Sequence, residues 1–271
     1  MRIAINGVRR REFLKGSAMV AGAAATGLTD IRPASAAPMQ RPVPYQVKDR
    51  KFEGMIVYDD SIKTRRPAVF MQPDWNGVSA ETIAQARTVA GKDYVVLVAD
   101  MFGAGWGAKQ RPRPELGAAV KAIRGDLAFT LACGNTALET MLAEANKLGL
   151  VDPAKTAAIG YCAGGGFVLE QARTGADFKA VVVFHVTNPS PADPGMGNKI
   201  KSRVLMIHGS ADPVTPKPAM DALQEELTKA KVDWQVMMLG GAVHSFCLPT
   251  DNPKYCRMSH ALMRDFLTET L

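Results

Sequence analysis

The stretch Ile159–Gly166 most constrains what this chain can fold into, because it sets a cysteine among closely spaced glycines at a predicted strand-to-helix junction. The residues before it are small and apolar, as at the end of a buried strand, and Phe167–Arg173 is typical of the first turns of a helix. Gly160 and Gly164 lie two residues before and two after Cys162, where a tight turn leaves no room for a Cβ atom. A cysteine at a helix N-terminus meets free N–H groups and the positive end of the helix dipole, which favour a thiolate.

A glycine-rich turn of this kind has two other interpretations. It can cradle a phosphate at the start of a helix, although this stretch lacks the Lys and Ser/Thr of a P-loop and the Gly-x-Gly-x-x-Gly pattern. A free cysteine is also often only a small buried apolar side chain. The interpretation of Cys162 as a nucleophile therefore depends on whether later segments of the chain supply a base and an acid.

Composition favours an ordinary α/β domain and argues against a nucleic-acid-binding protein. The hydrophobic content of 47% is ample for a large core, and 4 cysteines are too few for a disulfide scaffold. The formal net charge is +7, but six basic and two acidic side chains fall within the first 36 residues, so the remainder is only mildly basic. That remainder has no dense Lys/Arg run and no basic helix with interleaved aromatic residues, so we expect no nucleic-acid partner.

Residues 1–36 have the pattern of an export signal. Arg10–Lys15 resembles the twin-arginine signal, although Arg9 stands where that pattern usually has Ser or Thr. A short Ala- and Gly-rich apolar run comes next, and Ala34-Ser35-Ala36 is a small-x-small cleavage site. We expect recognition by the twin-arginine export machinery, cleavage near Ala36, a periplasmic or secreted mature protein and no stable membrane span. The alternative is an ordinary basic amphipathic N-terminus.

The rest of the chain alternates short apolar strands with helical patterns. Residues 37–50 contain several prolines and are predicted to be an extended linker. The helical pattern over residues 116–148 is expected to break near Gly125 or Gly134. Strands are predicted at residues 52–58, 67–72, 94–99, 156–159, 179–184, 203–208 and 233–239. The alternation predicts one α/β domain over residues 51–271, with a mostly parallel sheet and helices on both faces.

Two later strand-end loops carry the partners that a nucleophile needs. Asp212 follows the strand at 203–208, and His244 follows the strand at 233–239. The chain order nucleophile, acid, histidine is that of the α/β-hydrolase fold, in which each member lies on a loop after a strand. We therefore predict Cys162 as nucleophile, His244 as general base and Asp212 as the group that orients it. The alternatives are that Asp212 only caps the next turn and that His244 is structural.

Three segments together resemble the dienelactone hydrolase family. They are the Gly-Tyr-Cys-x-Gly-Gly turn, the Gly-Ser-x-Asp-Pro loop at 209–213 and the Gly-Gly-Ala-x-His-Ser-Phe loop at 240–246. Asp-Trp-Asn-Gly at 74–77 is also similar to that family's segment after an early strand, so the resemblance covers about residues 52–271. It implies a carboxylic-ester or lactone hydrolase that forms a thioester acyl-enzyme on Cys162. No cofactor is expected, and no group of residues has metal-ligand spacing in the sequence.

The resemblance also assigns supporting residues. The backbone N–H groups of Ala163 and Trp75 are the predicted oxyanion hole. Asp74 stands where the family has a glutamate that tunes the thiol. Leu248 replaces the arginine that binds the carboxylate of dienelactone, which favours a neutral or more apolar ester. Besides Leu248, the side chains expected to shape the substrate pocket are Met101, Phe102, Trp106 and His185.

The sequence also allows other functions and makes predictions for the remaining cysteines. The same fold also serves a thioesterase, and a non-catalytic binding protein could retain it without useful turnover. Cys133 is predicted to be a core residue. Cys247 and Cys256 flank one loop and could form a disulfide in an oxidising compartment.

Overall fold

A computed structural model describes residues 39–187, 189, 198–247 and 252–271. The predicted signal segment 1–36 and Leu248 lie outside these residues. Residues Ala36–Leu271 form one compact unit by their internal contacts. Among the helices described, none combines the length and the apolar character needed to cross a bilayer.

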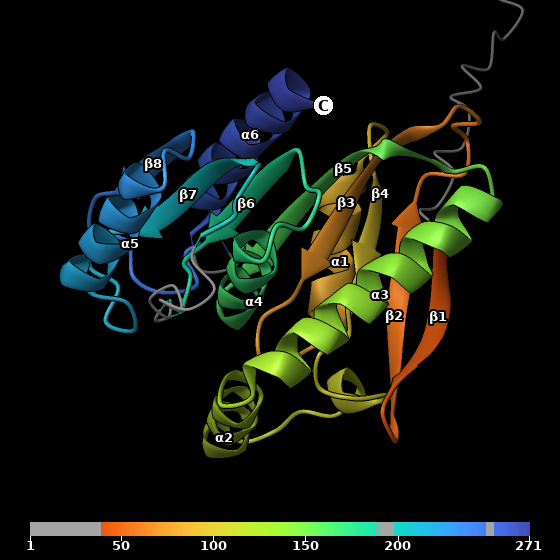
Figure 1. The fold of residues 1–271 in the computed structure, drawn as a ribbon, viewed down its shortest axis with the longest axis horizontal. Coiled ribbons are helices and arrows are strands. Elements are labelled where there is room, and N and C mark those ends of the chain that lie inside the picture. The colour runs from red at the N-terminus through yellow and green to blue at the C-terminus, as the bar shows by residue number, and fades with distance from the viewer. Residues whose placement is uncertain (1–38, 188, 190–197, 248–251) are drawn as a thin grey trace, which may run out of the picture. The chain divides into compact units, whose positions relative to one another are not determined.

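The unit is built on an eight-stranded sheet with the order β1-β2-β4-β3-β5-β6-β7-β8 (Figure 1). β1 pairs antiparallel with β2, and β2 pairs antiparallel with β4. All the remaining pairs, from β4 through to β8, are parallel, which confirms the predicted mostly parallel sheet. The strands are β1 (Met39–Val47), β2 (Arg50–Tyr58), β3 (Arg66–Gln72), β4 (Val95–Val98), β5 (Val151–Tyr161), β6 (Ala180–Phe184), β7 (Arg203–Gly209) and β8 (Trp234–Leu239).

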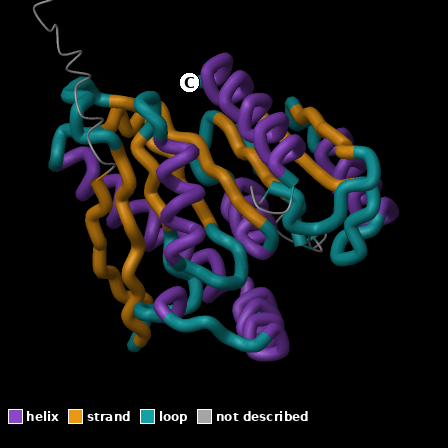
Figure 2. The backbone as a smooth tube through the Cα atoms, turned by 180° about the vertical axis from the view of Figure 1, so that it is seen from behind, coloured by secondary structure: helices purple, strands orange, loops and turns teal. Residues whose placement is uncertain are grey.

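Helices cover both faces of the sheet and create two apolar cores. One core joins alternate strand residues to buried side chains of α2 (Arg113–Arg124), α3 (Leu127–Lys147), α4 (Ala163–Arg173) and α5 (Lys217–Lys229). The other core packs the opposite strand residues against α1 (Ala80–Ala90) and α6 (Pro253–Thr270). Figures 1 and 2 show these two layers from opposite sides. The strands β4 and β6 are buried along their whole length, because both faces of the sheet are covered there.

The predicted linker over residues 37–50 is corrected by the structure. Met39–Val47 forms β1, hydrogen bonded along its length to β2. Its alternating Val43, Tyr45 and Val47 side chains are buried, whereas Pro42 and Pro44 point outward. β1 is an edge strand, where repeated prolines are tolerated because their missing N–H groups can face solvent instead of a neighbouring strand.

The expected break in the long helical pattern occurs at Gly125. α2 ends at Arg124 with Gly125 as its C-cap, and Asp126 begins α3 by accepting a hydrogen bond from Phe129 N–H. Gly134 lies inside α3, where an added Cβ would come within 2.6 Å of the Gln171 side chain. This glycine therefore permits close packing of α3 on α4 rather than breaking the helix.

Candidate active site

The junction of β5 and α4 holds Cys162 in a backbone conformation that is rare for a residue with a side chain. Its φ is 55° and its ψ is −117°. The end of β6 and the chain after it secure this turn. The N–H of Cys162 donates to the carbonyl oxygen of Phe184, and the carbonyl oxygen of Cys162 accepts from the N–H of Thr187, both at 3.0 Å. A strained residue that its surroundings hold so firmly is typical of a functional site.

The two glycines flanking Cys162 are required by close backbone contacts. A Cβ on Gly160 would lie 2.4 Å from the carbonyl oxygen of Gly164. A Cβ on Gly164 would lie 2.1 Å from the carbonyl oxygen of Gln72. The steric argument from the sequence is confirmed, and the second contact adds a consequence. The start of α4 packs directly on the loop after β3, which brings Ala163 close to the segment that carries Trp75.

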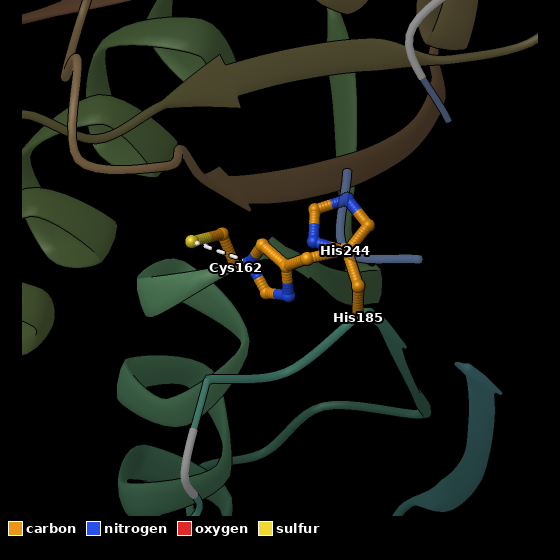
Figure 3. Close-up of side chains that lie close together, drawn as sticks. All are labelled: Cys162, His185 and His244. Carbon is orange, nitrogen blue, oxygen red and sulfur yellow. Dashed lines mark hydrogen bonds between the residues drawn. The ribbon is translucent and has the colours of Figure 1, made fainter. Parts of the chain in front are cut away.

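Cys162, His244 and Asp212 form a continuous hydrogen-bonded row. His244 Nε2 lies 3.2 Å from Cys162 Sγ, as the dashed line in Figure 3 marks. His244 Nδ1 lies 2.7 Å from Asp212 Oδ2. The residues follow β5, β7 and β8, whose carboxyl ends share one edge of the parallel sheet. The spacing matches what a nucleophile, a base and an orienting carboxylate require.

Asp212 is fixed on a buried loop and kept ionised. Its side chain is 0% exposed, and Oδ1 accepts hydrogen bonds from the N–H groups of Val214 and Thr215. Burial by itself raises the pKa of Asp212, but the hydrogen bonds from His244 and from these amides outweigh burial and lower it below its ordinary value. Asp212 therefore does more than cap the next turn, since its other oxygen faces His244.

His244 is a stronger base than an ordinary histidine side chain. Burial alone lowers the pKa of His244, but hydrogen bonds and charge interactions with Asp212 and Cys162 raise it to about 9. At neutral pH this pKa keeps the imidazole of His244 protonated beside the Asp212 carboxylate. The ring also meets His185 edge-on, with the ring centroids 4.8 Å apart.

Thr187 is a site residue that the sequence analysis missed. Its Oγ1 lies 3.0 Å from Cys162 Sγ, on the chain that leaves β6. Arg124 Nη1 donates to the carbonyl oxygen of Thr187 at 3.0 Å. The only signal for Thr187 in the sequence is that it follows a predicted strand, and many residues share that property.

His185 was predicted to shape the substrate pocket, but it is buried against His244 and is not among the residues that line the cleft above Cys162. It is only 3% exposed and has a φ of 37°. Its Nε2 lies 2.9 Å from Cys247 Sγ, and burial lowers the pKa of His185 to about 3, so the ring is neutral. Its Nδ1 has no hydrogen-bond partner among the described residues. The ligand atoms of Cys162, His185 and His244 all lie within 4.8 Å of one another, a grouping that their sequence spacing did not indicate.

A cleft of about 580 Å³ opens above Cys162. Asp74, Trp75 and Ala163 all line it, as the sequence analysis expected of groups near the reacting carbonyl. Ala163 is the first residue of α4, so its N–H has no intrahelical acceptor. The other residues along the cleft are Gly117, Val120, Lys121, Arg124, Gly125, Cys162, Thr187, Val214, His244 and Ser245.

Asp74 directs its hydrogen bonds to its own loop. Its carboxylate accepts from the backbone N–H of Asn76 at 2.8 Å and from the side-chain amide of Asn76 at 3.2 Å. Burial raises the pKa of Asp74 above its ordinary value, although these bonds oppose the shift. Asp74 therefore shapes the loop that carries Trp75.

The other residues expected in the pocket lie elsewhere. Met101 and Phe102 are buried in the core beneath the cleft-forming loops, and Trp106 stacks on Phe102 and donates its Nε1–H to the carbonyl oxygen of Trp75. Within the part of the chain that the structure describes, none of the three lines the cleft above Cys162. Trp106 and Phe102 act on the site indirectly, because they support the loop of Trp75.

All four cysteines are free thiols. Cys133 lies fully buried in α3, as predicted. Cys247 is bonded to His185, and Cys256 Sγ lies 3.6 Å from Nδ1 of His260, so the structure has no disulfide between them.

Sequence comparison assigns the chain to a known group. The family profile described as "Dienelactone hydrolase family" matches residues 52–269. An uncharacterised protein of Caenorhabditis elegans is 32% identical over 113 residues, which cover 41% of this chain and 72% of that protein.

Solved structures share the fold. A dienelactone hydrolase-like promiscuous phosphotriesterase, P91, from metagenomic libraries has 32% sequence identity and a TM-score of 0.79, over 86% of this chain and 99% of that one. Esterase 2 of Thermogutta terrifontis has 18% identity and a TM-score of 0.64, over 88% of this chain and 96% of that one, and this likeness concerns the fold alone.

Proposed function

The chain belongs to the dienelactone hydrolase family, and we propose that it hydrolyses carboxylic esters or lactones through a Cys162–His244–Asp212 triad. The single observation that carries the proposal is the position of His244. Its two ring nitrogens lie 3.2 Å from Cys162 Sγ and 2.7 Å from Asp212 Oδ2. One imidazole thus links a nucleophile at the base of an open cleft to a buried carboxylate.

In the first half of the reaction the ester is cleaved. The Cys162 thiolate attacks the carbonyl carbon, a carbon–sulfur bond forms, and the carbonyl oxygen becomes an oxyanion. The N–H groups of Ala163 and Trp75 donate hydrogen bonds to this oxyanion. When the tetrahedral intermediate collapses, the carbon–oxygen bond to the alcohol breaks and His244 gives its Nε2 proton to the departing alkoxide.

In the second half the thioester is hydrolysed. Neutral His244 removes a proton from water as the water oxygen attacks the thioester carbonyl. Collapse of this second intermediate breaks the carbon–sulfur bond and releases the acid. The thiolate and the imidazolium are restored together, and Asp212 stabilises the imidazolium throughout.

Hydrolysis of p-nitrophenyl acetate and butyrate tests the proposal. We expect Cys162→Ala to lower kcat/KM by at least about 10³-fold, because the covalent route is lost. Cys133→Ala is the matched control, since it removes another free thiol that is fully buried in α3. Equal rates for wild type and Cys162→Ala would show that Cys162 is not the nucleophile.

Two alternatives use the same fold. A thioesterase would prefer acyl thioesters over oxygen esters with the same acyl group, so a matched pair of substrates separates the two. A non-catalytic binding protein would leave Cys162 unreactive. Fast alkylation of Cys162 at neutral pH, lost in His244→Ala, would contradict that alternative.

The similarity to P91 adds phosphotriesters as a second substrate class to test. Attack by Cys162 Sγ on the phosphorus forms a phosphorus–sulfur bond through a trigonal-bipyramidal arrangement and breaks the phosphorus–oxygen bond to the leaving alcohol, which takes the proton from His244. Water then cleaves the phosphorus–sulfur bond and restores the thiol. We expect slower turnover than with carboxylic esters. Loss of both activities in Cys162→Ala would place them on one nucleophile.

For the N-terminal segment we propose export by the twin-arginine route followed by cleavage near Ala36. The support is the sequence of residues 1–36 alone. The N-terminal residue of protein isolated from the periplasm tests this proposal. A mature chain that begins before residue 30 would contradict it.

A further inference from the structure

His185 has features that ester hydrolysis does not use. It is 3% exposed, its φ is 37°, and its Nδ1 has no partner among the described residues. A buried nitrogen without a hydrogen bond is costly, and most such groups in proteins are satisfied. Figure 3 shows that this nitrogen lies on the side of the ring that faces Cys162.

We propose that Cys162, His185 and His244 form a zinc site, and that zinc bound there switches the hydrolase off. Their ligand atoms lie within 4.8 Å of one another. Tetrahedral zinc has Zn–S near 2.3 Å and Zn–N near 2.0 Å, which places neighbouring ligand atoms about 3.5 Å apart. At no more than 4.8 Å from one another, the three ligand atoms are already close to that spacing.

The ligand set selects the metal. One thiolate and two imidazoles suit zinc, whereas magnesium and calcium require oxygen ligands. Three protein ligands leave the fourth tetrahedral position for water, on the side of the open cleft. The cleft also supplies an entry path for the ion.

Each histidine has a neighbour that fixes its ring for this role. His244 Nδ1 bonds to Asp212, which leaves Nε2 for the metal. In the tautomer of His185 that carries its proton on Nε2, Nε2–H donates to Cys247 Sγ. The lone pair of Nδ1 is then available to the metal. Such outer partners orient metal-ligating histidines in known sites.

The inhibition rests on the proposed function, whereas zinc binding does not. Zn²⁺ takes the electron pairs of Cys162 Sγ and His244 Nε2, so a proton on either atom is released to solvent when the ion binds. The sulfur is then no longer free to attack a carbonyl, and His244 has no proton for the leaving group. A chelator restores both.

The test uses the mature chain, stripped with EDTA and then titrated. Esterase activity of the metal-free protein is measured first and tests the proposed function separately. Zn²⁺ binding is followed by competition with a chromogenic chelator, and Co²⁺ binding by its thiolate charge-transfer absorption. We expect one ion per chain at micromolar concentration and loss of esterase activity that EDTA reverses.

Variants locate the site. His185→Ala should weaken zinc binding by more than about tenfold, and Cys162→Ser should remove the charge-transfer absorption. Cys133→Ala should bind as the wild type does. Unchanged zinc affinity in a folded His185→Ala variant would overturn the proposal, as would the absence of stoichiometric binding or activation by zinc. If His185→Ala does not fold, His185→Gln replaces it, with the same expected loss.

Discussion

At the scale of single residues, Cys162 Sγ has two polar neighbours with different tasks. His244 Nε2 lies 3.2 Å away and transfers the proton in the proposed reaction, while Thr187 Oγ1 lies 3.0 Å away and can only donate or accept a hydrogen bond. A hydroxyl that donates to a thiolate stabilises it by about 1.5–3 kcal/mol. We therefore expect Thr187→Val to slow alkylation of Cys162 by iodoacetamide at neutral pH by about tenfold or more.

Thr187→Ser is the matched control for this prediction, because it keeps the hydroxyl and removes only a methyl group. Its alkylation rate should stay within about threefold of wild type, since a methyl contributes less than 1 kcal/mol. Equal rates for the Val and wild-type proteins would show that the hydroxyl does not act on the thiolate.

Asp212 supports His244 through one oxygen and its own loop through the other. In Asp212→Asn, the amide oxygen can keep the bonds from Val214 and Thr215, while the NH₂ group faces His244 Nδ1. His244 then loses its acceptor and its preferred tautomer. We expect kcat for p-nitrophenyl butyrate to fall by about 10²–10⁴-fold with the thermal midpoint little changed. A variant with full activity would remove Asp212 from the triad.

At the scale of elements, the turn between β5 and α4 is fixed by glycines for steric reasons. In Gly164→Ala the added Cβ would lie 2.1 Å from the carbonyl oxygen of Gln72. This atom belongs to the backbone, so the contact cannot be relieved by the rotation of a side chain. We expect a loss of at least about 3 kcal/mol in the free energy of unfolding, or failure to fold. Urea unfolding followed by circular dichroism measures it.

Gly117→Ala is the control for this steric argument. Gly117 lies inside α2, and an added Cβ meets nothing within 4 Å. The substitution should raise the free energy of unfolding by about 0.5–1 kcal/mol, because alanine is the better helix former. Equal effects at Gly164 and Gly117 would contradict the argument from close contact.

The arrangement of the strands explains which parts of the fold and of the candidate site could be predicted from the sequence. The close approach of Cys162, Asp212 and His244 was predictable because each follows a strand, and parallel strands bring their carboxyl ends to one edge of the sheet. β1 was mistaken for a linker because its prolines masked the alternation of Val43, Tyr45 and Val47. Prolines repeated along a strand are typical of a sheet edge, and edge position is a property of the assembled sheet.

The arrangement around His185 was not predictable for a related reason. His185 follows β6 and has an unusual φ. Its contacts are with His244 and Cys247, which follow β8. Sequence spacing places these residues far apart, so no metal-ligand pattern is visible along the chain. The cleft also differs from expectation, because residues of α2 line it, whereas Met101, Phe102 and Trp106 belong to the apolar core or pack against it.

At the scale of the whole molecule, burial of neutral histidines couples stability to acid. His185, His208 and His260 are each at most 8% exposed, and burial lowers the pKa of all three. The folded chain therefore holds fewer protons on them than the unfolded chain does below about pH 6.5. Their contribution to stability is present above that pH and is lost as pH falls, by up to about 1.4 kcal/mol per pH unit for each histidine.

His208→Gln tests this coupling without touching the proposed zinc ligands. His208 Nε2–H donates to the carbonyl oxygen of Thr215, and the Nε2 amide of glutamine can make the same bond without titrating. Between pH 7 and pH 5, urea unfolding in EDTA should show a loss of stability in wild type that exceeds the loss in the variant by up to about 2 kcal/mol. Parallel losses would mean that His208 is charged in the folded protein at pH 5, and that Asp212, 3.8 Å away, stabilises its cation more than burial disfavours it.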